Sequence, residues 1–465
     1  MSFDINLGKD NVIPFNKKIL LSKDINLLPK LDRELGPIEQ KMRLILDRIK
    51  DSKYPDTFDW SIYDKIAARY GENQPRGGVV YNKVLKLVNY HTSCSKCHYA
   101  FELDTYGRGC VHNCVWCYAK ETLTRHGYWN EPIPFPVNLA ELRKEFYTAF
   151  ETDKSSKWSD ILRKRIPIRL GSMSDSFMWM DKKYKVTLEL LKILRHYQYP
   201  YIIFTRSDLV ADDLYMKVLD PKLSSIQFSI CGGNEQLTKT LEPGSPSVLR
   251  RLVALRKLSE NGFWTTVRIN PLFPIYPDGY FTDPDSVKIR FGSRANVPKF
   301  DLFDWSFIGT LKEYKVPSVL AGMARLTPFA IRAISKETGF DYSLFFKPEL
   351  FQKAADSRFS DGEIAFYYKK IQIECANARI RFNTCYIGNG EKDYYQYQQL
   401  WDNKKDCCDA RGNVPAFNAS SHEISWDERF RHASNIETAE IAKAQEEKYD
   451  KIYTEDTKST PEIQL

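Results

Sequence analysis

Short runs of β-forming residues alternate with helical patterns through the middle of this 465-residue chain, and this alternation constrains the fold most strongly. The β-rich runs cover residues 100–106, 166–171, 201–205, 225–230, 264–270 and 305–310. Strands that are separated by helices pair in parallel, because each helix crosses back over the sheet. The pattern therefore predicts an α/β fold, a partial (β/α)6 TIM-like barrel, with an active site at the carboxyl ends of its strands.

Two apolar stripes between these runs have helical spacing: Val186, Leu190, Leu194 and Tyr197, and then Val248, Leu252, Leu255 and Leu258. For the second helix we predict Ser245 as the N-cap, Pro246 at the first helical position and Gly262 just past the end. Residues 271–304 lack a helical period, so we expect a long loop there, either a lid over the active site or a surface insertion without function.

The flanking segments differ from the barrel in composition. We predict an N-terminal extension over 1–99 and the barrel over 100–340. A cysteine-bearing extension over 341–434, with a helix at 361–378, and a polar tail over 435–465 follow. Within the first extension, one amphipathic helix is indicated by the spacing of Ile38, Met42, Ile45 and Ile49.

Charge and hydrophobicity narrow the class of protein. Hydrophobic residues make up 43% and charged residues 28% of the chain, which suits a packed core and excludes wholesale disorder. No apolar run approaches the roughly 20 residues of a membrane helix, and the first residues lack a signal-peptide core, so we expect a cytoplasmic protein without a membrane partner. The net charge of +8 suits an anionic partner such as nucleic acid, or a solvated lysine-rich surface.

Three of the ten cysteines stand close together in GRGCVHNCVWCYAK, as Cys110, Cys114 and Cys117. Thiolates are the usual ligands of iron–sulfur clusters, and three of them leave the fourth iron of a [4Fe–4S] cluster open for catalysis. A structural zinc site, completed by His112 or by Cys94 and Cys97, is the alternative, although zinc favours paired C-x2-C spacing.

This motif, with Trp116 before the last cysteine and a β-rich run before the first, resembles the radical S-adenosylmethionine (SAM) superfamily. CVHNCVWCYA, GSMSD, FTRSD, LEPGSPSVLRR and RINPLFP together resemble its spore photoproduct lyase-like branch. The resemblance implies a cluster on the three cysteines that binds SAM and cleaves it to a 5′-deoxyadenosyl radical, which abstracts a hydrogen atom. It also implies an electron donor such as flavodoxin or ferredoxin.

Carried over position by position, the resemblance implies a set of cofactor-binding residues: Ser174, Asp175, Arg206 (where the family usually has lysine) and Ser229, with Tyr118 and Asn270 as further candidates. Strand-end Ser and Asp residues also cap helices, which is the structural alternative for Ser174 and Asp175.

One departure from the family concerns its hydrogen donor. Spore photoproduct lyases return a hydrogen atom from a cysteine near the end of the second strand, where this chain has Ser172. A serine O–H bond is too strong for that role, so thymine-dimer repair is doubtful. Cys231 is the cysteine that we expect to act as an alternative catalytic donor.

The remaining six cysteines fall into two groups: Cys94 and Cys97, and then Cys375, Cys385, Cys407 and Cys408. If the C-terminal segment folds back, they could bind an auxiliary iron–sulfur cluster or zinc ion. The alternative is that they are buried as small hydrophobic residues.

These observations leave three functions to distinguish. The first is radical modification or repair of a nucleic acid or nucleotide, and the second is radical modification of a peptide or small metabolite. The third is a non-catalytic metal-binding protein.

Overall fold

A computed structural model describes residues 86–87, 101–107, 109–125, 129, 134–137, 139–163, 167–277, 279–298, 302, 306–348, 357–385, 397–402 and 407–410. The helix predicted around residues 38–49, the polar tail, and Cys94 and Cys97 lie outside the described residues.

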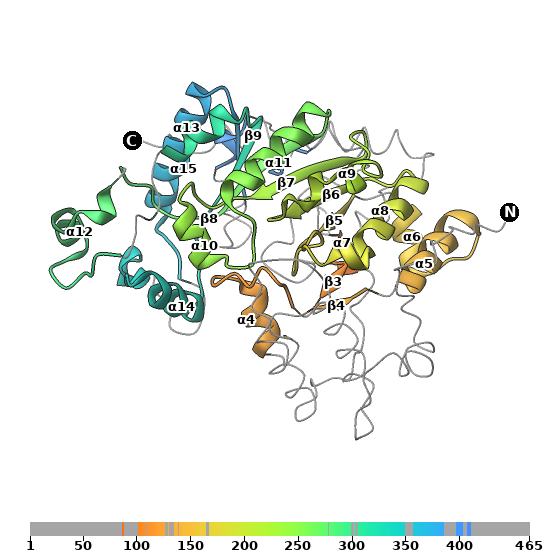
Figure 1. Cartoon of the computed structure of the whole chain (residues 1–465), viewed down its shortest axis with the longest axis horizontal. Coiled ribbons are helices and arrows are strands. Elements are labelled where there is room, and N and C mark those ends of the chain that lie inside the picture. The colour runs from red at the N-terminus through yellow and green to blue at the C-terminus, as the bar shows by residue number, and fades with distance from the viewer. Residues whose placement is uncertain are drawn as a thin grey trace, which may run out of the picture.

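One eight-stranded sheet organises the described chain (Figure 1). Its first strand, β1 (Lys86–Leu87), pairs antiparallel with β2. The other pairings are parallel and follow the order β2 (Phe101–Leu103), β5 (Ile168–Leu170), β6 (Tyr201–Thr205), β7 (Ser224–Ser229), β8 (Trp264–Leu272), β9 (Ser318–Met323) and β10 (Arg381–Thr384). A separate antiparallel pair is formed by β3 (Tyr106–Gly107) and β4 (Phe135–Pro136).

Side chains on the inner side of the sheet show that it curls into a partial TIM-like barrel. Phe204 of β6 shares a buried cluster with Leu320 of β9, although β7 and β8 separate these strands in the sheet. Arg169 of β5 and Arg268 of β8 both stack on the Phe204 ring, at 5.3 and 4.8 Å from its centroid. A flat sheet would hold these strands too far apart for such contacts, because neighbouring strands are about 4.8 Å apart.

Helices flank the strands (Figure 1). They are α4 (Tyr118–Arg125), α5 (Leu139–Glu151), α6 (Lys157–Arg163), α7 (Asp181–Tyr184), α8 (Val186–His196), α9 (Asp213–Met216), α10 (Glu235–Leu241), α11 (Val248–Glu260), α12 (Pro284–Phe291), α13 (Ser306–Glu313), α14 (Pro328–Thr338) and α15 (Asp361–Asn377). Short 3-10 helices are η2 (Asp208–Ala211), η3 (Tyr280–Thr282), η4 (Tyr342–Phe345) and η7 (Gln398–Leu400). The apolar stripes predicted for α8 and α11 are buried except for Tyr197, which follows the end of α8 and is half-buried. The helix α15 coincides with the helix predicted at 361–378.

The prediction of a strand at 305–310 is wrong. Residues 306–310 belong to α13, where Phe307, Ile308 and Leu311 are buried at helical spacing while Lys312 is exposed. The sixth parallel strand is instead β9, which begins after Pro317. A short apolar run fits a buried strand or one face of a helix, and its residues alone do not separate the two.

Two local predictions also need correction. Residues 271–304 contain the helix α12, which Asp283 caps by accepting from the backbone N–H groups of Asp285 and Ser286. The N-cap of α11 is Ser247, which accepts from the backbone N–H of Arg250, and not Ser245. Gly262 follows that helix with φ of 84°, as predicted for its C-terminal stop.

The parallel sheet continues into the segment predicted as an extension. A seventh parallel strand, β10, pairs with β9 in the register Arg381 to Ser318. Residues 407–410 then return to the inner side of the barrel, where Cys407, Cys408 and Ala410 share the buried cluster that contains Phe204. The C-terminal part of the described chain therefore fills part of the barrel interior.

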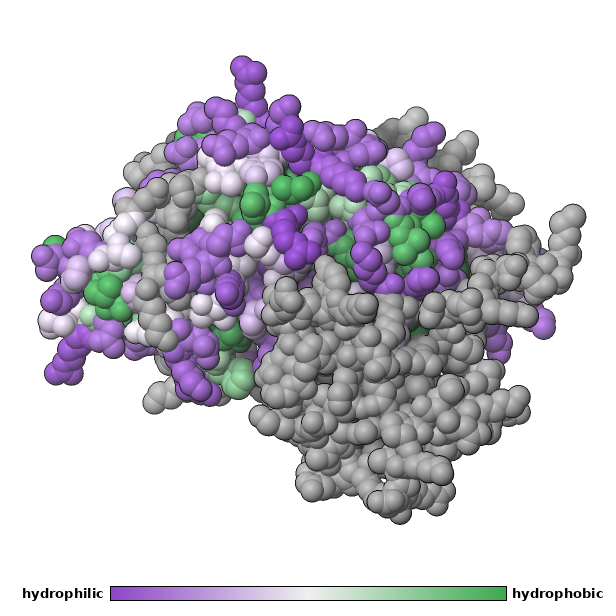
Figure 2. All heavy atoms as spheres, viewed as in Figure 1, coloured by the Kyte–Doolittle hydropathy of each residue, from purple (hydrophilic) through white to green (hydrophobic). Residues whose placement is uncertain are grey.

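The surface is mostly hydrophilic in the view of Figure 2, with limited apolar areas between charged residues. The exposed apolar side chains include Leu249 and Val253 of α11. Among the described helices, none combines the length and apolarity that a membrane span requires.

Candidate functional site

The three clustered cysteines lie on the loop between β3 and α4. Asn113 has φ of 47°, and its N–H donates to the carbonyl of Cys110 at 3.1 Å, so the chain turns sharply after the first cysteine. A second turn joins the N–H of Cys117 to the carbonyl of Cys114 at 3.2 Å. The turns place the three thiols near enough for electrostatic interaction, which links Cys114 with Cys110 and Cys117, and Cys110 with Cys117.

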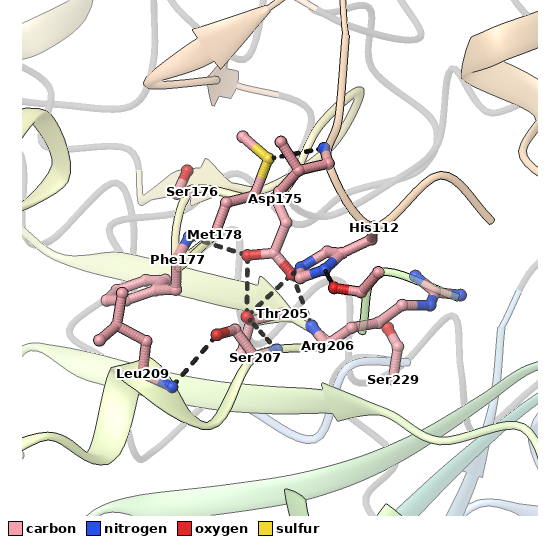
Figure 3. Close-up of polar contacts among 12 residues, drawn as sticks. His112, Asp175, Ser176, Phe177, Met178, Thr205, Arg206, Ser207, Leu209 and Ser229 are labelled. Carbon is pink, nitrogen blue, oxygen red and sulfur yellow. Dashed lines mark hydrogen bonds and ion pairs between the residues drawn. The ribbon is translucent and has the colours of Figure 1, made fainter. Parts of the chain in front are cut away.

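A buried ion pair fastens this loop to the carboxyl end of β5. His112 Nε2 lies 3.1 Å from the Asp175 carboxylate, and its Nδ1 lies 3.0 Å from the carbonyl oxygen of Gly244 (Figure 3). Both ring nitrogens of His112 therefore face a hydrogen-bond acceptor, since a carbonyl and a carboxylate only accept. His112 therefore links the cysteine loop to two other segments of the chain.

Asp175 holds several elements in place at once. Its carboxylate accepts from Thr205 Oγ1 and from the backbone N–H groups of Arg206 and Phe177, at 2.6 to 2.9 Å, as well as from His112 (Figure 3). Burial raises the pKa of Asp175, but these donors and the charge of His112 outweigh burial and lower it. Both oxygens of the Asp175 carboxylate, which we predicted to bind the cofactor, therefore accept hydrogen bonds from groups within the protein.

Arg206, at the end of β6, connects the loop to a second buried ion pair. Its Nε donates to Glu242 at 3.0 Å, and Glu242 also pairs with the fully buried Arg251 at 2.6 Å. The positively charged guanidinium of Arg206 interacts electrostatically with the thiols of Cys114 and Cys231. Cys231 is therefore placed beside Arg206 and Glu242, near the cysteine loop.

Ser172, Ser174 and Tyr118 join the same edge of the barrel. The Tyr118 hydroxyl donates to the Ser172 carbonyl at 3.0 Å, and the Ser174 hydroxyl donates to the Tyr106 carbonyl. Asp104 accepts from the backbone N–H of Ser172 at 2.8 Å. Tyr118 is 59% exposed, so its ring is accessible beside Cys117.

Ser229 and Asn270 come from β7 and β8. Ser229 is buried, and its carbonyl accepts from Arg251 Nη1 at 2.9 Å. Asn270 lies against Gly322 of β9 so closely that a Cβ there would be 2.9 Å from the Asn270 side chain. The predicted residues thus come from the ends of β5 to β8 and from the cysteine loop, while only some of their side chains are in direct contact.

The electrostatics of the three cysteines fit a strongly cationic group. Burial and the Asp175 carboxylate raise the pKa of the Cys110 thiol to about 12. Hydrogen bonds from the backbone N–H groups of Asp175 and His112 lower this pKa, but their effect is smaller. Burial likewise raises the pKa of Cys114, against the charge of Arg206. Cluster ligands are thiolates, and at this buried loop iron ions would supply the positive charge that favours the thiolate form. The residues present therefore fit a [4Fe–4S] cluster.

Within the described ranges, no set of three His, Cys, Asp or Glu side chains forms a group that could hold a metal ion. A four-iron cluster differs from such a site because each thiolate binds a different iron, so its ligands need not converge on one point. Cys375 lies in the outer core on α15, away from the barrel interior that contains Cys407 and Cys408. The auxiliary metal site stays a prediction.

The sequence alone left several residues of this site without a role, chiefly Asp104, Thr205, Glu242 and Gly244, and considered His112 only as a zinc ligand. Glu242 and Gly244 belong to the segment LEPGS, which carries part of the family resemblance. Their contacts with the cysteine loop depend on how close that loop lies to LEPGS, and the sequence does not give this distance.

Comparisons with known proteins give distant similarities, and no family model matches the chain. An uncharacterized protein of Methanocaldococcus jannaschii is 28% identical over 211 residues, 44% of this chain and 71% of that protein. One of Mycobacterium tuberculosis is 21% identical over 207 residues, and this match covers 58% of its length.

Solved structures were compared by fold. Spore photoproduct lyase complexed with dinucleoside spore photoproduct has a TM-score of 0.44 and 16% identity, over 66% of this chain and 81% of that one. Streptococcus suis SuiB has a TM-score of 0.35 and 11% identity, over 80% and 71%. The radical S-adenosylmethionine methyltransferase TsrM of Kitasatospora setae has a TM-score of 0.34 and 11% identity, over 60% and 51%.

Gly244 allows a test of how the cysteine loop is held. A Cβ at this position would overlap the carbonyl of Val111 and lie 2.8 Å from Cα of His112, so the loop would have to move. We expect Gly244→Ala to lower bound iron by about half or more, because displaced cysteines hold the cluster poorly. Gly309→Ala is the control, since nothing lies within 4 Å of its added methyl group. Equal iron in both variants would contradict the proposed tight contact.

Proposed function

We propose that this protein is a radical SAM enzyme whose [4Fe–4S] cluster binds Cys110, Cys114 and Cys117. The observation that carries the proposal is the placement of three cysteines on one turn-rich, largely buried loop, beside His112 and the guanidinium of Arg206. When bound, the cluster supplies the electron that cleaves SAM to a 5′-deoxyadenosyl radical. An electron donor such as flavodoxin or ferredoxin is part of the proposal.

The residues of the chain hold and orient these groups. His112 and Asp175 fix the cysteine loop against the end of β5, and the positive charge of Arg206 favours the thiolate form of Cys114. We assign SAM to the side chains at the carboxyl ends of the strands: Ser174, Arg206, Ser229 and Asn270, with Tyr118 from α4 and with Asp175 acting through His112. Buried contacts around this edge exclude water from the reacting groups.

The first test measures iron and SAM cleavage together. The wild-type protein, purified without oxygen, should bind about four irons and release 5′-deoxyadenosine when reduced by dithionite. The Cys110→Ala, Cys114→Ala and Cys117→Ala triple variant should lose the irons and the cleavage, while Cys375→Ala should retain both. Zinc in place of iron, lost with the three cysteines, would identify a structural metal site instead.

We propose a nucleic acid or nucleotide as the substrate class. The net charge of +8 favours an anionic partner, and Arg169 and Arg268 place two guanidinium groups at the barrel interior beside an aromatic ring. Cations next to a ring suit the combination of phosphate and base in a nucleotide. A peptide or small metabolite remains the competing substrate class.

Oligonucleotide binding distinguishes these substrates. We expect the affinity for a short DNA or RNA strand to fall by about tenfold or more between 50 and 200 mM salt, because phosphate contacts release counterions. Arg268→Gln should weaken binding and reduce the salt slope, whereas Arg256→Gln, on the outer surface of α11 beside Glu260, should leave both unchanged. If no oligonucleotide binding is measurable at 50 mM salt, the substrate is more consistent with a peptide or a small metabolite.

Cys231 is our proposed hydrogen-atom donor. Burial and the Glu242 carboxylate raise the pKa of its thiol to about 12, so at neutral pH Cys231 keeps the S–H bond that such a donor needs. In D2O this thiol carries deuterium. When no substrate is present, the 5′-deoxyadenosyl radical should take that deuterium and leave a thiyl radical on Cys231, so the 5′-deoxyadenosine should contain deuterium. Cys231→Ala should lower that deuterium content by about half or more, and Cys375→Ala should not. Unchanged labelling would exclude Cys231 as the donor.

A further inference from the structure

Three cysteine thiols surround the guanidinium of Arg268 on the inner side of the barrel. Arg268 donates from Nη2 to Sγ of Cys385 at 3.2 Å and from Nη1 to Gln227 at 3.2 Å. The Sγ atoms of Cys407 and Cys408 lie 3.9 Å apart, and both thiols act electrostatically on the same guanidinium. Two segments of the chain thus bring three thiols around one cation.

The thiols differ in their access to solvent. Cys385, directly after β10, is half-buried, whereas Cys407 and Cys408 are buried. A reagent from solvent therefore meets Cys385 first. The segment that carries Cys407 and Cys408 is held in place by a hydrogen bond from Gln227 Nε2 to the Cys408 carbonyl at 3.0 Å.

Asp409 anchors the same segment more firmly. Its carboxylate accepts from the Ser318 hydroxyl at 2.8 Å and from Arg381 Nη2 at 2.6 Å. Since Ser318 and Arg381 begin β9 and β10, the segment that carries Cys407 and Cys408 is fixed to the strand whose end carries Cys385.

Such an arrangement has the parts of a thiol–disulfide exchange site. A thiolate is the nucleophile in this exchange, and Arg268 orients the Cys385 sulfur through its hydrogen bond at 3.2 Å. A reactive, accessible cysteine beside a less accessible one also separates the attacking thiol from the resolving thiol. The Arg268 contact assigns the attacking role to Cys385.

We infer that Cys385, Cys407 and Cys408 form a redox-active site that is oxidised by small disulfides. The Cys385 thiolate attacks a disulfide RSSR, forms a Cys385–S–S–R bond and releases RS⁻. A thiolate of Cys407 or Cys408 then attacks the Cys385 sulfur and releases the second RS⁻. The protein loses two electrons to form one internal disulfide, and the disulfide reagent gains them as two thiols.

This inference does not depend on radical chemistry, because none of the three cysteines belongs to the loop that we assign to the iron–sulfur cluster. The two proposals can therefore fail separately. Loss of SAM cleavage leaves the exchange reaction intact, and loss of the exchange reaction leaves the cluster loop unchanged.

The test uses the full chain, reduced and then treated with glutathione disulfide without oxygen. Trypsin cuts after Arg381 and Lys392 and after Lys405 and Arg411, so Cys385 lies on peptide 382–392 and the other two cysteines lie on peptide 406–411. We expect mass spectrometry to find these two peptides joined by a disulfide. Cys385→Ser should abolish the joined species, and Cys375→Ser, a buried cysteine on α15, should leave it unchanged.

A rate measurement tests the role of Arg268 without relying on one variant. Arg268→Gln should slow modification of Cys385 by glutathione disulfide about tenfold, and Arg268→Lys, which keeps the charge, should restore most of the rate. Circular dichroism confirms that each variant is folded before the rates are compared.

Three results would overturn the inference. The first is a folded protein in which the two peptides never join. The second is a disulfide confined to peptide 406–411 with Cys385 still free. The third is iron or zinc that stays bound after Cys110, Cys114 and Cys117 are replaced by alanine and that protects Cys385 from the reagent, since the thiols would then be metal ligands.

Discussion

The contact between His112 and Asp175 is the interaction on which the candidate site depends. It joins the cysteine loop to the end of β5, and Asp175 in turn holds the end of β6 through Thr205 and the Arg206 backbone. A buried ion pair costs free energy to desolvate, and breaking one by removing a single partner typically costs about 3–5 kcal/mol. The further hydrogen bonds to Asp175, and the one between His112 and the Gly244 carbonyl, offset the cost of desolvation. The cysteine loop, the ends of β5 and β6 and the LEPGS segment are therefore held together.

Much of the fold followed from the sequence, because strands and helices leave different spacings of apolar residues. The runs that became β2 and β5 to β8, and the stripes of α8 and α11, were all identified correctly. The run at 305–310 failed because its apolar residues also suit a helix, and α13 buries Phe307 and Leu311 on one face. β10 was not predicted because its sequence, RFNT, includes Arg and Asn and does not form a β-rich run, and its partner β9 had been missed as well.

For the site too, features set by neighbouring residues could be predicted, whereas contacts between distant segments could not. Cysteine spacing is local, so the sequence identified Cys110, Cys114 and Cys117 together. The partners of Asp175 come from three segments whose approach is set by sheet register, and the two contacts of His112 likewise join segments that are distant in sequence. Likewise, the grouping of Cys385 with Cys408 and the separation of Cys375 depend on which side of the sheet each faces.

The return of residues 407–410 to the barrel interior has a consequence for how the chain assembles during synthesis. The hydrogen bond from Gln227 to Cys408 joins residues 181 positions apart in sequence. Contacts of such separation form late, because a long loop must close first, and a ribosome releases the N-terminal strands well before this segment. Early in synthesis, Ile202, Phe204 and Leu320 therefore have an unfilled apolar surface. The nascent barrel is an open sheet until its own C-terminal segment completes the interior.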